Sequence, residues 1–130
     1  MRRISLSVSQ SRILRHLCLA LALLLIALIF GMADSSLATG TLNFQPPLDK
    51  LLHAGVYGTI AALLCCAGVL RSRVLVWQLV VGIGMADELH QLTIVGRESS
   101  LSDLCADVVG VTLGLWLTSW LLSELLVQRE

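Results

Sequence analysis

Four long apolar runs, separated by short polar stretches, dominate the pattern of the chain. They cover residues 17–33, 51–70, 74–86 and 108–123, and none of them contains Asp, Glu, Lys or Arg. A helix needs about 20 residues to cross a hydrocarbon core of about 30 Å, so runs of this kind predict membrane-spanning helices. The pattern therefore predicts an all-α, polytopic integral membrane protein with a bundle of four transmembrane helices.

The third and fourth runs are too short to cross a membrane unaided. Residues 74–86 rise only about 20 Å at 1.5 Å per residue, so the third helix has to continue through Asp87 and Glu88. The fourth helix has to begin early enough to include Asp107 and Asp103. Ionisable groups at this depth cost about 3 kcal/mol each unless they are paired or wetted. The alternative for the third run is a buried helix of the soluble type or a re-entrant hairpin.

Basic residues set the expected orientation. Cytoplasmic loops of membrane proteins carry an excess of Lys and Arg. Four spans with a cytoplasmic N-terminus place seven of these residues inside and two outside, so both termini are predicted to be cytoplasmic. The inner set is Arg2, Arg3, Arg12, Arg15, Arg71, Arg73 and Arg129, and the outer set is Lys50 and Arg97.

The first run has two interpretations. As a transmembrane span it covers residues 17–33, after a cytoplasmic segment 1–16, and the chain ends in a cytoplasmic tail, 125–130. Alternatively, the basic residues, the apolar run and the small residues before Asp34 form a cleaved signal peptide, which leaves three spans. The run is longer than the usual ~7–15 apolar residues of a signal peptide, which favours a span.

Polar residues gather on one face of three predicted helices, near the outer end of each. In the second helix their spacing is i, i+3, i+7, and in the third and fourth it is i, i+4, so each set shares a face. Each of these residues, taken singly, has a structural explanation, such as the enrichment of Tyr at membrane interfaces. Gly110 and Gly114 on the fourth helix likewise form a pair that is typical of close helix packing. Their convergence at one depth predicts a site. The residues are Lys50, His53 and Tyr57, then Asp87, Glu88 and Gln91, then Asp103 and Asp107.

The charges of this group do not cancel. With Asp49 included, five carboxyl groups face Lys50 and Arg97, while His53 and His90 can add protons. Either some carboxyl groups carry protons, or a cation or cationic group binds there. The candidate ligand-binding residues are Asp49, Lys50, His53, Tyr57, Asp87, Glu88, Gln91, Arg97, Asp103 and Asp107, and the candidate catalytic residues are His53, Asp87 and Glu88.

Composition excludes several classes of protein. Hydrophobic residues make up 56% of the 130 residues and charged residues 14%, against about 25% charged residues in soluble domains. A soluble enzyme, a disordered chain and a nucleic-acid binder are therefore excluded, the last also because the net charge is zero. The four cysteines show no CxxC or Cys/His spacing, and no HExxH motif occurs, so we expect no metal and no cofactor.

Three motifs resemble those of the VanZ-like membrane proteins. The string from Asp49 to Tyr57 is similar to D-K-x-x-H-x-x-x-[YF], and the string from Asp87 to Gln91 is similar to D-E-x-x-Q. Arg97 stands where the family has an arginine, and the segment Asp103 to Gly110 is similar to the D-x-x-x-N-x-x-G that follows it. Asp107 differs from this pattern, because the family has Asn there. The resemblance covers Asp49 to Gly114, in a VanZ-like domain at residues 34–124, and leaves the first span outside.

The resemblance implies a protein of the bacterial cytoplasmic (inner) membrane and cell envelope, with a link to teicoplanin-type antibiotic resistance. The leading hypothesis is binding or modification of an envelope lipid or lipid-linked cell-wall precursor at the outer leaflet, where Lys50 and Arg97 would contact phosphate or carboxylate. The expected partners are membrane lipids, with no nucleic acid.

Two other functions are open. In an intramembrane hydrolase or transferase, His53 with Asp87 or Glu88 would move protons. A version of this reaction assisted by a metal bound to His and carboxylates is also open, although no ligand spacing supports it. In a structural or accessory membrane subunit, the polar residues would serve helix packing. For Lys50, Glu88 is a candidate ion-pair partner.

Overall fold

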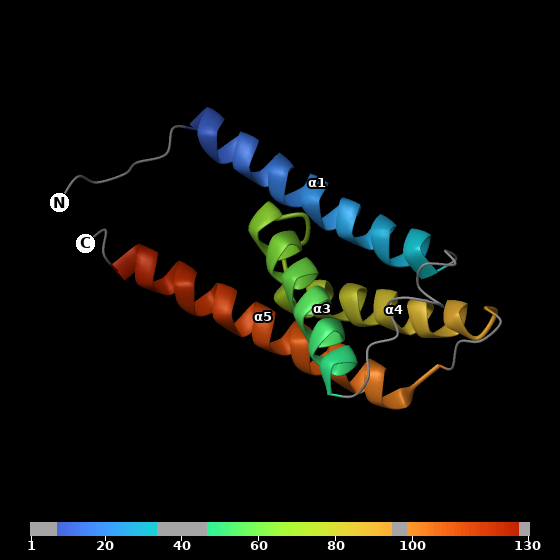
Figure 1. Cartoon of the computed structure of the whole chain (residues 1–130). Helices are drawn as coiled ribbons and strands as arrows, with labels where there is room; N and C mark the ends of the chain where they lie inside the picture. The colour runs from blue at the N-terminus through green and yellow to red at the C-terminus, as the bar shows by residue number, and fades with distance from the viewer. Residues whose placement is uncertain (1–7, 34–46, 95–98, 128–130) are drawn as a thin grey trace.

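Four α-helices make up the part of the chain that the computed structural model describes, residues 8–33, 47–94 and 99–127 (Figure 1). No β-strand occurs in these ranges, so the predicted all-α fold is confirmed. Three helices contain segments that are long and apolar enough to span a membrane, namely Ser11–Met32, Leu48–Ala67 and Leu101–Glu124. The helices are α1 (Val8–Ala33), α3 (Leu48–Ala67), α4 (Arg73–Gln91) and α5 (Leu101–Val127).

Short sequence signals set the turn between α3 and α4. Helix α3 ends at Ala67, before the apolar run does, because Gly68 takes a left-handed conformation (φ 66°) and its N–H donates to the carbonyl of Cys65. Glycine tolerates this conformation without a steric penalty, which makes it a common helix terminator. Ser72 then caps α4, since its Oγ accepts a 3.2 Å bond from the Val74 N–H. The two helices are thereby connected by a tight turn.

Helices α4 and α5 extend into charged sequence, as the shortness of their apolar runs predicts. Helix α4 is one continuous helix of 19 residues that includes Asp87 and Glu88, and it rises about 28 Å. The hairpin alternative for this segment is therefore wrong, whereas a membrane span formed by α4 stays a prediction, because α4 is not among the three candidate spans. Helix α5 begins at Leu101 and includes Asp103 and Asp107.

The four helices alternate in direction. The rings of Phe30 in α1 and His90 in α4 lie 5.8 Å apart, and Lys50 near the start of α3 bonds Asp103 near the start of α5. The ends of α1 and α4 therefore lie with the starts of α3 and α5, at what is called here the polar end. The start of α1 and the end of α5 both lie at the opposite end of the bundle, apart from each other (Figure 1).

The apolar core lies between α3, α4 and α5. It contains Tyr57, Ile60, Val76, Val80 and Val111, each at most 2% exposed, while α1 adds the buried Ala22. Large apolar side chains such as those of α1 and the tryptophans of α5 are exposed on the outside. Lipid tails are as apolar as leucine, so this outer surface fits a bilayer.

Small residues let α3 and α5 cross in close contact. A Cβ atom added at Gly58 would lie 2.6 Å from the carbonyl oxygen of Gly110, one added at Gly110 would overlap the backbone of Ala54, and one added at Gly114 would overlap that of Gly58. Real Cβ atoms do not approach other atoms this closely, so the crossing requires glycine at these positions. The sequence identified Gly110 and Gly114 as a packing pair. Ala54 and Gly58 are the residues of α3 that lie against this pair.

Candidate functional site

Lys50 forms two ion pairs at the polar end of the bundle. Its Nζ donates to Asp103 Oδ1 at 2.7 Å and to Asp49 Oδ2 at 3.1 Å. The Lys50 side chain is 35% exposed, so it lies at the rim of the group. Its partners are these two carboxylates and not Glu88, which corrects the pairing considered from the sequence. Spacing along a chain gives the face of a helix but not the partner across from it.

His53 lies one turn further into the bundle and contacts Asp107. His53 Nδ1 is 2.9 Å from Asp107 Oδ1, and the ring stacks on that of Tyr57 with centroids 6.0 Å apart. Asp107 is fully buried, and its Oδ2 has no hydrogen-bond partner among the described residues. The carboxylate that orients His53 is thus Asp107, whereas the sequence analysis considered Asp87 and Glu88 for that role.

Tyr57 is the deepest of the three polar residues on this face of α3. It is 2% exposed, and its hydroxyl donates to Asp87 Oδ2 at 3.1 Å. The same oxygen accepts a 3.2 Å bond from Gln91 Nε2. Tyr57 is therefore a buried partner of Asp87, and the alternative of an interfacial tyrosine does not apply.

Glu88 is held by the start of α5. The residue is 5% exposed, and its Oε2 accepts bonds from Ser99 Oγ at 3.0 Å and from the Ser100 N–H at 2.7 Å. Its Oε1 is buried and has no hydrogen-bond partner in the described part of the chain. Sequence reasoning missed Ser99 and Ser100. The two adjacent serines shortly before Asp103 were a signal, but they are also typical of an ordinary helix start.

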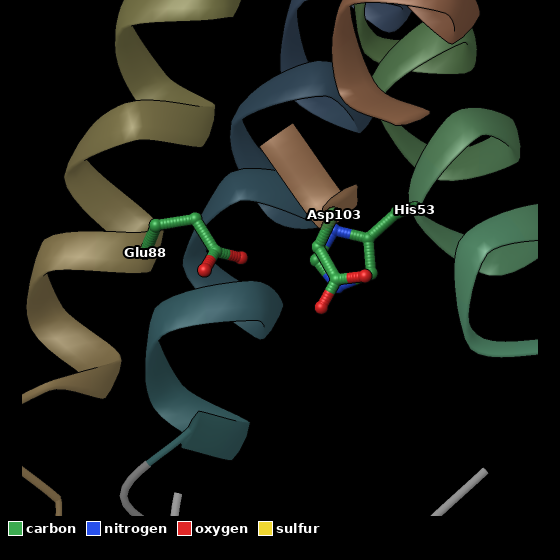
Figure 2. Close-up of side chains that lie close together, drawn as sticks. All are labelled: His53, Glu88 and Asp103. Atoms are coloured by element: carbon green, nitrogen blue, oxygen red, sulfur yellow. The ribbon is translucent and has the colours of Figure 1, made fainter. Parts of the chain in front are cut away.

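Side chains from three helices meet in the centre of this group. His53 of α3, Glu88 of α4 and Asp103 of α5 point toward one another (Figure 2), and each offers a nitrogen or oxygen within 4.8 Å of the others. Imidazole and carboxylate are ligands for divalent metal ions. No spacing within one helix reveals this group, since each helix supplies one member.

Nine of the ten candidate ligand-binding residues gather at the polar end. They come from the first turns of α3 and α5 and the last turns of α4. Arg97 lies outside the described residues. A role for these residues in ligand binding stays a prediction. The nine residues are Asp49, Lys50, His53, Tyr57, Asp87, Glu88, Gln91, Asp103 and Asp107.

The described group is acidic. It contains five carboxyl groups against Lys50 and the ionisable ring of His53. Such a set favours a cation, or an anion that arrives with a cation. The His53–Asp107 pair has the arrangement of a general base with an orienting carboxylate.

Comparison with known protein families shows to which family the chain belongs. A family model described as VanZ/LLP1 matches residues 14–122, and the chain belongs to this family. A search of curated proteins and a search of solved structures each found no match. The matched region begins inside α1, so it extends beyond the motif-bearing segment, and the first helix, which the motifs left outside, falls within it.

Proposed function

We propose that the protein binds the headgroup of an envelope lipid or lipid-linked cell-wall precursor at the outer leaflet of the bacterial cytoplasmic membrane. The observation that carries the proposal is the burial of Asp87, Glu88, Gln91 and Asp107, each at most 6% exposed, in an otherwise apolar bundle. Ionisable residues at membrane depth are expensive and mark functional sites by default. Packing alone does not require three ionisable residues and a glutamine on two helices.

Lys50 and a neighbouring groove support a lipid as the ligand. The Lys50 ammonium at the rim suits a phosphate or carboxylate. Leu51 and Leu52 follow it directly in α3 and line an open apolar groove between α1 and α3, together with Leu25, Gly55, Val56 and Thr59. A ligand with its apolar tail in the groove would have its headgroup near Lys50.

The outer leaflet is favoured by the distribution of basic residues. Arg71 and Arg73 lie at the turn opposite the polar end. If that turn is cytoplasmic, as the excess of arginine on its side favours, the polar end faces outward, and both chain termini are cytoplasmic.

Native mass spectrometry of the protein extracted in mild detergent tests this function. We expect an added mass that corresponds to an anionic envelope lipid or polyprenyl-linked precursor, and its loss in Lys50→Ala. The matched control is Arg71→Ala, which removes one exposed positive charge at the opposite end and should keep the lipid. Absence of bound lipid, or equal loss in both variants, would contradict the proposal.

A link to teicoplanin susceptibility belongs to the same proposal. A bound cell-wall precursor would alter access of a glycopeptide to its target. We expect expression of the protein to change the minimal inhibitory concentration of teicoplanin, and Lys50→Ala to reverse that change. An effect that persists in Lys50→Ala would separate susceptibility from the site.

The His53–Asp107 contact favours a second candidate, an intramembrane hydrolase or transferase. An imidazole held by a carboxylate can take a proton from water or a hydroxyl group. In that case His53→Gln should abolish product formation from the bound lipid while the lipid still binds. If a folded His53→Gln protein retains full function in cells, acid–base catalysis by His53 is excluded.

A further inference from the structure

The three side chains at the centre of the polar end have the composition of a metal site. His53, Glu88 and Asp103 offer one nitrogen and two oxygens within 4.8 Å of one another, from three different helices (Figure 2). From this geometry we propose that His53, Glu88 and Asp103 bind one divalent transition-metal ion such as Mn²⁺ or Zn²⁺.

The unpartnered oxygen of Glu88 is an independent observation in favour of a cation. Glu88 is 5% exposed, its Oε1 is buried without a hydrogen-bond partner among the described residues, and its carboxylate points toward Asp103 and His53 (Figure 2). A buried carboxylate needs a compensating charge or hydrogen bond. Lys50, the lysine at this end of the described structure, is already bonded to Asp49 and Asp103.

Each of the three ligands is also held by a second group. Asp107 contacts His53 Nδ1, which leaves Nε2 as the nitrogen for a metal. Histidine ligands of metals are commonly oriented in this way by a carboxylate on the other ring nitrogen.

The other two ligands have the same arrangement. Ser99 and Ser100 hold Oε2 of Glu88 and leave Oε1, and Lys50 holds Oδ1 of Asp103 and leaves Oδ2. In each of the three side chains, hydrogen bonds thus occupy one candidate ligand atom and leave the other for a metal.

Charge and ligand type select the ion. A neutral imidazole with two carboxylates carries two negative charges, which balance a divalent cation. One nitrogen and two oxygens suit Mn²⁺ or Zn²⁺ better than a soft ion, and three protein ligands leave open coordination positions. Bonds of about 2.0–2.2 Å bring neighbouring ligands closer together than 4.8 Å, so small rotations of the side chains would close the site.

The inference goes beyond the proposed function. Only one consequence rests on that function: an ion in this position would let an acidic site accept an anionic headgroup on its open coordination positions. Binding of the metal by itself is independent of any lipid. A test with the metal alone therefore separates failure of this inference from failure of the proposed function.

The experiment uses the full chain in mild detergent, purified without a histidine tag and stripped with a chelator. The four cysteines are replaced by alanine so that thiols do not bind Zn²⁺. Titration with Mn²⁺ or Zn²⁺ should show one ion per chain, and pulsed electron paramagnetic resonance of the Mn²⁺ form should show coupling to an imidazole nitrogen.

Variants assign the ligands. Glu88→Gln and Asp103→Asn should each weaken binding at least ~10-fold, since loss of even an outer partner of a metal ligand has effects of this size. His53→Gln should remove the nitrogen coupling. The matched control is Glu124→Gln, which removes one exposed carboxylate near the other end of α5, and its affinity should equal that of the parent. Thermal unfolding of the metal-free variants shows that each is folded.

Two outcomes would overturn the inference. The first is that the folded parent binds neither Mn²⁺ nor Zn²⁺ stoichiometrically. The second is that the nitrogen coupling persists in His53→Gln, or that Glu124→Gln weakens binding as much as Asp103→Asn, because the ion would then lie elsewhere or be attracted by overall negative charge.

Discussion

The carboxylate of Asp107 in α5 occupies the space that a side chain at Gly84 in α4 would fill. A Cβ atom at Gly84 would lie 2.6 Å from Asp107 Oδ2, while the other oxygen of Asp107 contacts His53 Nδ1 at 2.9 Å. The absence of a side chain at Gly84 therefore leaves room for the Asp107 carboxylate in the position from which it contacts the His53 ring. An asparagine at position 107, as in the family pattern, would have the same size.

Gly84→Ala should disturb the site as well as the fold. The added methyl group has to displace the buried Asp107 carboxylate, and overpacking of this kind costs about 1–3 kcal/mol. The control is Gly82→Ala two residues away, where a Cβ meets nothing within 4 Å; it should be neutral or stabilising by up to about 1 kcal/mol, since alanine favours helix. Reversible unfolding in detergent measures both variants. Equal stabilities would show that Asp107 moves aside freely.

The crossing of α3 and α5 gives a second prediction. Gly110→Ala should lower stability by at least about 1–3 kcal/mol, because its methyl group would overlap the backbone of Ala54 and force the helices apart. Gly55→Ala is the control on the partner helix, since a Cβ there meets nothing within 4 Å. Thermal melts and expression levels distinguish the two. A Gly110→Ala protein as stable as Gly55→Ala would mean that the helices do not pack through this face.

Lys50 gives a third prediction, on ion-pair coupling. A double-mutant cycle of Lys50→Ala with Asp103→Asn should be non-additive, because their side chains bond at 2.7 Å. The cycle of Lys50→Ala with Glu88→Gln should be close to additive, because Glu88 is held by Ser99 and Ser100 instead. Chemical unfolding of the parent, the three single variants and the two double variants supplies the energies. Stronger coupling to Glu88 than to Asp103 would contradict the observed pairing.

The orientation of the bundle is the fourth prediction. In a cysteine-free background, Thr93→Cys lies at the polar end and Val69→Cys at the opposite turn, and both positions are exposed. An impermeant maleimide added to intact cells should label Thr93→Cys, and it should label Val69→Cys only after permeabilisation. The reverse result would place the polar end in the cytoplasm and rule out an outer-leaflet ligand.

The sequence was sufficient for the helices and for the burial of the acidic residues. The interruption of apolar runs by Asp87, Glu88 and Asp107 forced these residues into helices, because a shorter helix does not cross a membrane. Their burial follows from the same constraint, since a charged group has to avoid lipid.

The partners within the site did not follow from the sequence. Lys50, His53 and Tyr57 share one face, but each bonds carboxylates on a different turn or helix. Those choices depend on how α4 and α5 are rotated, and this rotation is set by close contacts such as those at Gly58 and Gly84. The spacing of Ala54 and Gly58 matched that of Gly110 and Gly114, and it was the one available signal for the register of the crossing.

The close crossing of α3 and α5 at their glycines also determines which helix can move at the polar end. Backbones that touch, as those of α3 and α5 do at Gly58 and Gly110, leave no side-chain layer that can repack, so these two helices behave as one rigid piece. Helix α4 instead joins α5 through side chains, including the 3.1 Å bond from Trp77 Nε1 to Thr112 Oγ1. A ligand that draws Glu88 toward His53 would therefore hold α4 against α3. The movement that it causes would be a tilt of α4 relative to the rigid pair of α3 and α5.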